Sequence, residues 1–172
     1  MPAGVIIFID GNPLRAAELK VLGIDVKVEA LQTGFSTSAP EPGQRARDKV
    51  LAHPVAAACF AEAVDLTTMA GKSLRLELDS GNENQFCKWN RETPAQMHLA
   101  IAVRRAADAP IELFTVVCEG RIADKPAGPH ILGWDRLFVP AGEDYTLAQL
   151  CEAGEIADFR RTAYAQVAAV LK

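Results

Sequence analysis

The strongest constraint on the fold lies at the start of the chain, where an apolar run enters a helix through a short polar turn. Residues 5–9 (VIIFI) are continuously apolar and rich in β-branched side chains, which is typical of a strand buried on both faces. Asp-Gly-Asn-Pro follows, and Asn12 and Pro13 suit the N-cap and first turn of a helix. This strand-turn-helix order favours an α/β fold with helices packed on a sheet.

The same alternation continues along the chain. Helical periodicity predicts helices over residues 14–22, 44–64 and 146–172, the second kinked or split at Pro54. Apolar or alternating runs predict strands over residues 25–31, 73–81, 97–103 and 111–122. Residues 33–44 and 82–94 are polar and predict a loop and an irregular, exposed segment. We therefore expect a mixed twisted sheet flanked by helices, in a single domain of residues 1–172.

Composition limits the partners and the compartment. A formal net charge of -4 disfavours a broad nucleic-acid-binding face, although a local basic cluster can still bind a small phosphate ligand. Four separated cysteines and three scattered histidines give no zinc spacing. No apolar run reaches membrane-spanning length and no signal peptide is evident. We expect a reduced, cytoplasmic protein that binds neither membrane nor nucleic acid.

The turn after the first predicted strand is the first candidate site. Backbone N–H groups at a helix start, together with the positive end of the helix dipole, suit a phosphate group. Arg15 lies one turn into the predicted helix and could reach the same anion. The alternative is an ordinary capped helix with a solvated arginine, because glycine-rich phosphate-binding signatures are absent.

Carboxylates form a second candidate site. Mg²⁺ on a polyphosphate uses one or two protein carboxylates, with water and phosphate oxygens as its other ligands. The acidic residues that fall near the ends of predicted elements are Glu18, Glu41, Asp65 and Asp79. Asp65 is the most suggestive, because it follows an apolar stretch and precedes small hydroxyl residues. The alternative is that these carboxylates are solvated surface groups.

The third candidate site joins GWDRLFVPAG to ADFRR. Trp134 could stack on a nucleobase, Asp135 could accept hydrogen bonds from its edge, and Arg160 could donate to a carbonyl or a phosphate. The alternative is that Trp134 belongs to the core, Asp135 caps a turn and Arg160 lies on a helix surface. From these residues alone, the alternative is preferred.

These sites occur in the order found in one known family. FIDGNPLRAAEL resembles the opening strand and T-G-N-x-x-K-x-x-E-L motif of the inosine triphosphate pyrophosphatase family. Residues 118–150 resemble its G-x-I-x-x-x-P-x-G, F-G-Y/W-D-P-x-F-x-P-x-G and T-x-A-E-L motifs, and ADFRR lies where the family has S-H-R. The resemblance implies two lobes around a central cleft.

The resemblance also assigns roles by position. It implies that Asn12, Arg15 and Lys49 hold phosphates, and that Asp65 is the catalytic acid and a metal ligand. Hydrolysis needs a second carboxylate near Asn12 and Arg15, which Glu41, Glu62 or Asp79 must supply, and Glu41 is the expected metal ligand. It further implies that Trp134 stacks on the base, whose edge Asp135, Asp158 and Arg160 read.

The chain departs from the family pattern at several of these positions. Asp10 stands where the first motif has Thr or Ser, and Val64 replaces the first of two paired acids. Arg136 replaces a proline, and Leu132 replaces a phenylalanine of the base pocket. Asp158 lies in the place of the serine of S-H-R. Because a carboxylate accepts hydrogen bonds from an amino group or a ring N–H, we expect a base with a different donor pattern, such as guanine, an amino-purine or a modified base.

Three functions remain open from the sequence. The resemblance implies Mg²⁺-dependent hydrolysis of a non-standard or modified purine nucleoside triphosphate to the monophosphate and pyrophosphate, by a homodimer. The altered acidic motif leaves a relative that binds a nucleotide or phosphorylated ligand without hydrolysing it. The third possibility is an interaction protein that binds no nucleotide.

Overall fold

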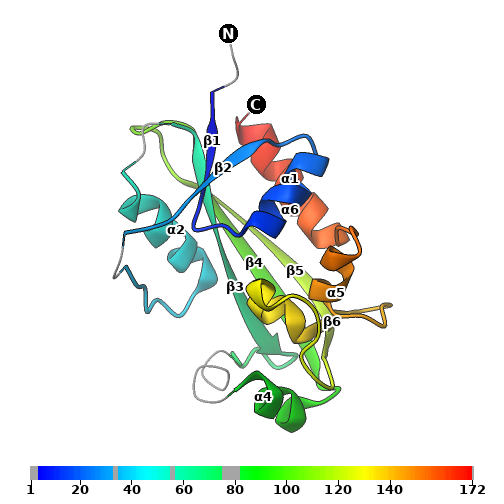
Figure 1. The fold of residues 1–172 in the computed structure, drawn as a ribbon. Helices are drawn as coiled ribbons and strands as arrows, with labels where there is room; N and C mark the ends of the chain where they lie inside the picture. The colour runs from blue at the N-terminus through cyan, green and yellow to red at the C-terminus, as the bar shows by residue number, and fades with distance from the viewer. Residues whose placement is uncertain (1–3, 33–34, 55–56, 75–81, 172) are drawn as a thin grey trace. The chain divides into compact units, whose positions relative to one another are not determined.

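The computed structural model describes residues 4–32, 35–54, 57–74 and 82–171. In chain order the elements are β1 (Ile6–Ile9), α1 (Pro13–Val21), β2 (Val26–Glu29), α2 (Pro42–Ala52), β3 (Cys59–Thr68), α4 (Glu83–Asn90), β4 (Pro94–Arg104), β5 (Glu112–Ile122), the 3-10 helix η1 (His130–Arg136), β6 (Phe138–Pro140), α5 (Leu147–Glu152) and α6 (Asp158–Leu171) (Figure 1).

The strands of the described residues form one mixed sheet in the order β2-β1-β3-β4-β5-β6. Strand β1 is parallel to both β2 and β3, whereas β5 is antiparallel to β6. The predicted α/β class, a mixed sheet flanked by helices, is therefore confirmed. The chain divides into two compact units, each described below by itself. Unit 1 is Met1–Ala63, Leu99–Val116 and Arg160–Lys172, and unit 2 is Val64–His98 and Val117–Phe159.

The turn from β1 to α1 has the predicted form. Asn12 has extended backbone angles and its side-chain oxygen accepts a hydrogen bond from the backbone N–H of Arg15 at 2.9 Å, with Pro13 in the first turn. Gly11 is required by packing, because a Cβ atom there would lie 2.4 Å from the ring of Phe8. Asp10 has a left-handed backbone, with φ of 56°, which asparagine and aspartate tolerate better than β-branched residues do.

Unit 1 has apolar layers on both faces of its strands. On one face, Ala46 and Val50 of α2 pack against Ile7 and Ile9 of β1 and against the small side chains of β3. Figure 1 shows α1 and α6 side by side on the other face. There, Phe8 stacks on Phe60, with ring centroids 4.6 Å apart. The alternation of side chains along β1 and β3 thus supplies a separate apolar surface to each helical layer.

Unit 2 has its own core. Its buried members come from β3, α4, β4, β5, β6, α5 and the segments after β3 and η1: Leu66, Leu74, Phe86, Cys87, Ala95, Met97, Ile122, Leu137, Phe138 and Leu147. Trp134 and Phe159 pack against this core and are half-buried. Gly133, next to Trp134, has a positive φ of 47° and breaks η1, as glycine readily does.

The predicted helix over residues 44–64 is wrong in its second half. Helix α2 ends at Ala52, and the His53 backbone that follows is extended, as expected for a residue that precedes proline. Residues 59–64 instead belong to β3, which lies between β1 and β4. Its alanines are good helix formers, but pairing with two neighbouring strands overrides that preference.

The segment 82–94 was also predicted incorrectly as irregular. It contains α4, which is capped by the Asn82 side chain and buries Phe86 and Cys87. The predicted C-terminal helix is two helices, α5 and α6, separated by a turn with Gly154 at φ of 82°. Most of the strand predicted over residues 73–81 lies outside the described residues, as does Asp79.

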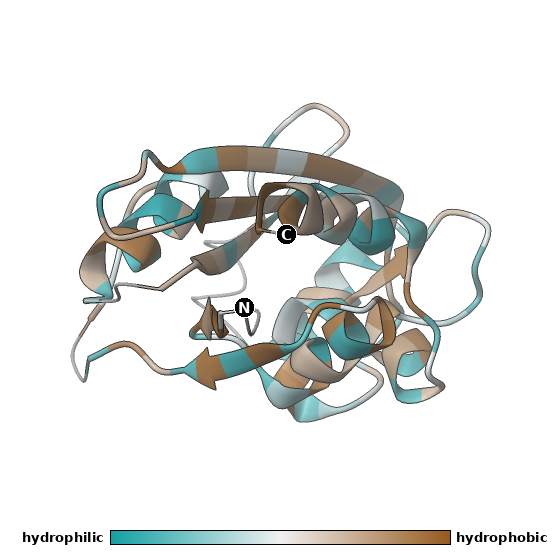
Figure 2. Ribbon diagram, turned by 90° about the horizontal axis from the view of Figure 1, so that it is seen from above, coloured by the Kyte–Doolittle hydropathy of each residue, from teal (hydrophilic) through white to brown (hydrophobic). Residues whose placement is uncertain are grey.

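Hydropathy follows the architecture within each unit. Figure 2 shows hydrophobic stretches along the strands, whereas the helices carry both hydrophobic and hydrophilic residues. In the described part of the chain, no helix is both long enough and apolar enough to cross a membrane.

Candidate functional site

Arg15 and Glu18 form a buried ion pair on α1. Arg15 is 4% exposed and Glu18 7%, so the expectation of a solvated arginine at this position is wrong. The Arg15 Nη1 atom donates to both carboxylate oxygens of Glu18, at 2.8 and 2.9 Å. The spacing of three residues places both side chains on one helix face, and each charge compensates the other away from water.

Arg160 lies beside this pair in unit 1. It is 2% exposed, and its Nη1 atom is 3.9 Å from Oε2 of Glu62 on β3. Burial alone lowers the pKa of Arg160, but its neighbours Tyr164, Glu62 and Glu18 together outweigh burial and raise the pKa overall. The guanidinium is therefore a buried, permanently charged group with carboxylate neighbours.

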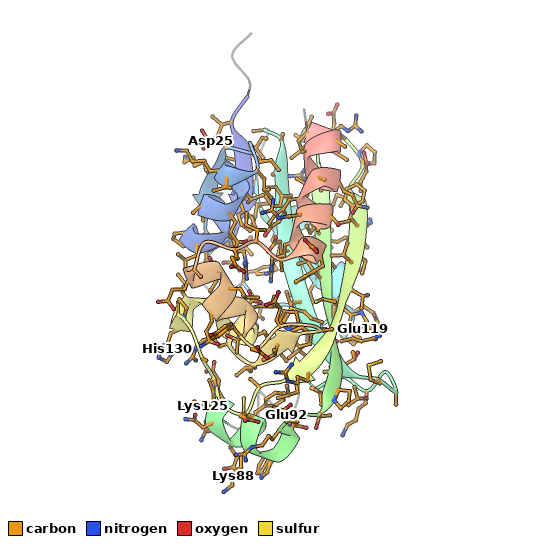
Figure 3. The ribbon with its side chains drawn as sticks, turned by 90° about the vertical axis from the view of Figure 1, so that its right-hand side faces the viewer. Asp25, Lys88, Glu92, Glu119, Lys125 and His130 are labelled. Atoms are coloured by element: carbon orange, nitrogen blue, oxygen red, sulfur yellow. The ribbon has the colours of Figure 1, made fainter. Side chains whose placement is uncertain are left out.

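Tyr164 lies one helical turn after Arg160 and is fully buried. Burial raises the pKa of its hydroxyl, and the negative charge of Glu62 raises it further. The phenol is consequently neutral at physiological pH and adds no charge to the site. Figure 3 shows side chains with nitrogen and oxygen atoms in the space between the α1 and α6 ribbons.

Lys49 on α2 has two oxygen partners. Its Nζ donates to the backbone carbonyl of Glu62 at 2.9 Å and lies 3.6 Å from a carboxylate oxygen of Asp10. The predicted phosphate ligand is thus next to the acid that replaces Thr or Ser in the family motif. Glu41, the second predicted metal ligand, is exposed at the start of α2, and its side chain makes no capping hydrogen bond.

Asp65 lies on β3 in unit 2 and is 6% exposed. It accepts a hydrogen bond from the Ser73 hydroxyl at 3.0 Å. Two residues further, and therefore on the same face of the strand, Thr67 Oγ1 lies 2.9 Å from Nε2 of His98. Asp65 thus has polar neighbours, as a buried carboxylate requires.

Trp134 and Asp135 lie in η1, in unit 2. The Trp134 ring meets Phe86 edge-on, with centroids 6.5 Å apart, and Asp135 is 3% exposed. The next residue, Arg136, donates from Nε to the Gly128 carbonyl at 3.0 Å and pairs with Glu83 of α4. The Trp134 ring therefore packs against the core of unit 2 and is also partly exposed to solvent.

Asp158 is exposed in the first turn of α6. It lines a cavity of about 490 Å³ within unit 2, together with Phe159, Glu119 and other residues. Figure 3 labels Glu119, which lies on β5. The structure thus gives Asp158 access to a hollow surface, whereas Arg160, two residues later, is buried in unit 1.

Sequence reasoning missed the grouping around Arg160. The Arg15–Glu18 spacing carried a usable signal, because oppositely charged residues three apart on a helix are neighbours. No comparable signal connects Glu62 with Arg160 or Tyr164, because their proximity depends on how β3 and α6 pack within unit 1. Among the described residues, no three His, Cys, Asp or Glu side chains gather as a metal-binding group.

Comparison with known proteins identifies the family. Residues 68–170 match the sequence profile of the Ham1 family. The chain belongs to the Ham1 family. The matched segment is more than half of the chain and contains Trp134, Asp135, Asp158 and Arg160. The resemblance found in the sequence is thereby confirmed.

A curated relative and three solved structures are similar to this chain. The dITP/XTP pyrophosphatase of Methanopyrus kandleri is 49% identical over 37 residues, which are 22% of this chain and 20% of that protein. The match therefore spans about a fifth of the curated relative's length.

The structural matches extend over nearly whole chains. A HAM1 protein from Coxiella burnetii gives a TM-score of 0.66 at 18% identity, covering 96% of this chain and 98% of the other. The Ham1 protein of Staphylococcus aureus gives 0.56 at 21%, covering 96% and 97%. A nucleoside-triphosphatase / dITP/XTP pyrophosphatase from Mycobacterium abscessus gives 0.53 at 20%, covering 96% and 97%. These similarities establish the fold.

Proposed function

We propose that this Ham1-family chain is a nucleoside triphosphate pyrophosphatase that cleaves a non-standard or modified purine nucleoside triphosphate to the monophosphate and pyrophosphate. The observation that carries the proposal is that the segment matching the family includes the Trp134-Asp135 motif and Arg160. The dITP/XTP pyrophosphatase name of a curated relative supports the substrate class. We further propose a single-domain, cytoplasmic homodimer, whose mass light scattering would measure.

In this proposal, phosphate groups are bound by Asn12, Arg15 and Lys49. The start of α1 offers backbone N–H groups and the positive end of the helix dipole. Arg15 supplies further donors from a buried guanidinium, and Lys49 supplies a compact ammonium charge. A triphosphate bound here would compete with Glu18 and Asp10 for these cations.

In the same proposal, the base is recognised by Trp134, Asp135, Asp158 and Arg160. The partly open Trp134 ring provides a stacking surface for a purine. The two aspartates accept hydrogen bonds from ring N–H or amino groups, whereas Arg160 donates to a carbonyl. Two acceptors favour a base that carries an amino group, such as guanine or an amino-purine.

One buried carboxylate, that of Asp65, has the chemistry of a Mg²⁺ ligand. Mg²⁺ takes oxygen ligands and uses one or two protein carboxylates when it binds with phosphates. Asp65 is such a group, with a hydroxyl donor from Ser73 to be displaced or shared, and Glu41 is the second proposed ligand. When bound, the ion would stabilise negative charge on the departing pyrophosphate.

A second function, nucleotide binding without hydrolysis, is favoured by the pairing of the cations. Arg15 and Lys49 each lie beside a carboxylate of the chain itself, and Val64 stands where the family has the first of its paired acids. Loss of a carboxylate from a metal-dependent site lowers the rate far more than it lowers affinity for the base.

The test is a pyrophosphate-release screen with a panel of standard and modified nucleoside triphosphates and Mg²⁺. Asp65→Asn tests the proposed metal ligand at nearly constant volume. Asp144→Asn is the matched control, because Asp144 is an exposed aspartate of the same unit. We expect turnover of one or a few bases, abolished by Asp65→Asn and retained by Asp144→Asn.

Two other outcomes have defined meanings. Thermal stabilisation by a nucleotide without turnover would support the binding function and exclude the pyrophosphatase. Absence of both turnover and stabilisation with every nucleotide would exclude both functions. Inosine and xanthosine triphosphates as by far the best substrates would refute the proposed preference for amino-bearing bases.

A further inference from the structure

Glu62 and Tyr164 lie next to Arg160, yet neither belongs to the motifs that carry the family resemblance. Glu62 is on β3, and its side chain is 13% exposed. Tyr164 is on α6, one turn after Arg160, and is fully buried. The two residues therefore bring a carboxylate and a phenol to the same guanidinium from different elements.

Burial makes these neighbours necessary to Arg160. A guanidinium cannot lose its proton inside a protein, so its charge must be compensated where it is buried. The Glu62 carboxylate is 3.9 Å from Nη1 of Arg160, and Glu18 also acts on the pKa of Arg160. Arg15 and Arg160 together carry two positive charges, which Glu18 and Glu62 match.

Tyr164 contributes volume and a hydroxyl without contributing charge. Burial and the Glu62 charge raise its pKa, so the phenol retains its proton. Because its ring is fully buried, it excludes water from one side of the guanidinium. A long arginine side chain surrounded in this way loses most of its rotational freedom before any ligand arrives, which lowers the entropic cost of binding.

We propose that Glu62 and Tyr164 are positioning residues that fix the Arg160 guanidinium for reading the substrate base. This inference rests on the proposed function, in which Arg160 contacts the base. Glu62 holds the guanidinium by charge and Tyr164 holds it by packing and its hydroxyl. Glu62 is thereby assigned to Arg160 rather than to the metal ion, for which it was one of three candidate second carboxylates in the sequence.

The experiment measures kcat and KM of three variants on the two best nucleoside triphosphates from the screen. Glu62→Gln removes the charge at constant volume, and Tyr164→Phe removes only the hydroxyl. Glu112→Gln is the matched control, because it breaks an ion pair to Arg105 that is exposed, with side chains 40% and 60% accessible. All variants are compared at equal concentrations of folded protein.

A positioning role predicts a selective loss. We expect Glu62→Gln to lower kcat/KM on the best substrate about 100-fold, as a displaced contact group does, and Tyr164→Phe to lower it about fivefold. The ratio of kcat/KM between the best and second-best base should fall in both variants. An equal fall of kcat/KM on both bases, which would leave that ratio unchanged, would overturn the proposal, as would wild-type kinetics of Glu62→Gln.

Thermal unfolding separates this inference from the proposed function. In a double-mutant cycle with Arg160→Met, we expect Glu62→Gln alone to lower Tm by about 10 °C and to have a much smaller effect when Arg160 is already replaced. Coupling in a protein that turns over no nucleotide would refute the proposed function while retaining the pairing. Additive effects on Tm would refute the pairing itself.

Discussion

Asp10 lies beside Lys49, with 3.6 Å between the carboxylate oxygen and Nζ. The acid occupies the motif position that holds Thr or Ser in the family, and its left-handed backbone suits aspartate or asparagine better than threonine. In the proposed site Lys49 binds phosphate, so a neighbouring carboxylate repels the same ligand that Lys49 attracts. If the proposed site binds a triphosphate, Asp10 would therefore weaken that binding.

The first prediction concerns this charge. Asp10→Asn retains the backbone preference and removes the negative charge, so we expect the KM for the best nucleoside triphosphate to fall about threefold to tenfold. The change should shrink at high salt, because Asp10 is half exposed. Steady-state kinetics at low and high ionic strength provide the measurement. An unchanged or higher KM at low salt would contradict the assignment of Lys49 as a phosphate ligand.

The second prediction concerns the buried Arg15–Glu18 pair. Arg15→Met leaves the Glu18 carboxylate buried without its cation, and we expect the free energy of unfolding to fall by about 3–5 kcal/mol. The double variant Arg15→Met, Glu18→Leu removes both charges and should recover most of that loss. Urea unfolding of the three proteins measures both values. A single variant as stable as the double variant would show that the buried pair is not what stabilises this face of α1.

Much of the fold could be predicted because its signals are local. The apolar run of β1 and the cap at Asn12 are read from adjacent residues, and both are present in the structure. Residues 59–64 were predicted incorrectly, because their alanine-rich composition favours a helix. Whether that segment pairs with β1 depends on residues distant in the sequence, which single-sequence periodicity does not report.

The candidate site could be predicted only in part, for a related reason. Asn12, Arg15 and Trp134 stand out by residue type and by position next to a turn or glycine. Glu62 does not, since an isolated glutamate in an apolar segment has no distinctive pattern. Its pairing with Arg160 becomes visible only when β3 and α6 are packed together.

The third prediction concerns the alkaline limit of stability. Burial, and after it the charge of Glu83, raises the pKa of the Cys87 thiol from 9.0 to about 11. Below pH 9 the thiol is protonated in both folded and unfolded chains, so its contribution to stability is fully present. Between pH 9 and about 11 the unfolded thiol ionises first, and the free energy of unfolding falls as pH rises.

Replacement of the thiol tests this contribution. Urea midpoints of the wild type and Cys87→Ala, measured from pH 8 to 11, should converge as pH rises, because only the wild type loses the thiol contribution. Cys151→Ala is the control, since that cysteine is half-buried. A constant difference between wild type and Cys87→Ala across this range would contradict the raised pKa.

The fourth prediction concerns Trp134 as a stacking surface. The chain has two tryptophans, and Trp89 is 65% exposed on α4, so Trp89→Phe leaves Trp134 as the single indole reporter. Purine nucleotides should quench its fluorescence, because a stacked base contacts the indole face directly. Inorganic triphosphate, which lacks a base, should produce little quenching at saturation. Equal quenching by inorganic triphosphate, or continued turnover without any quenching by the substrate, would show that the base does not stack on Trp134.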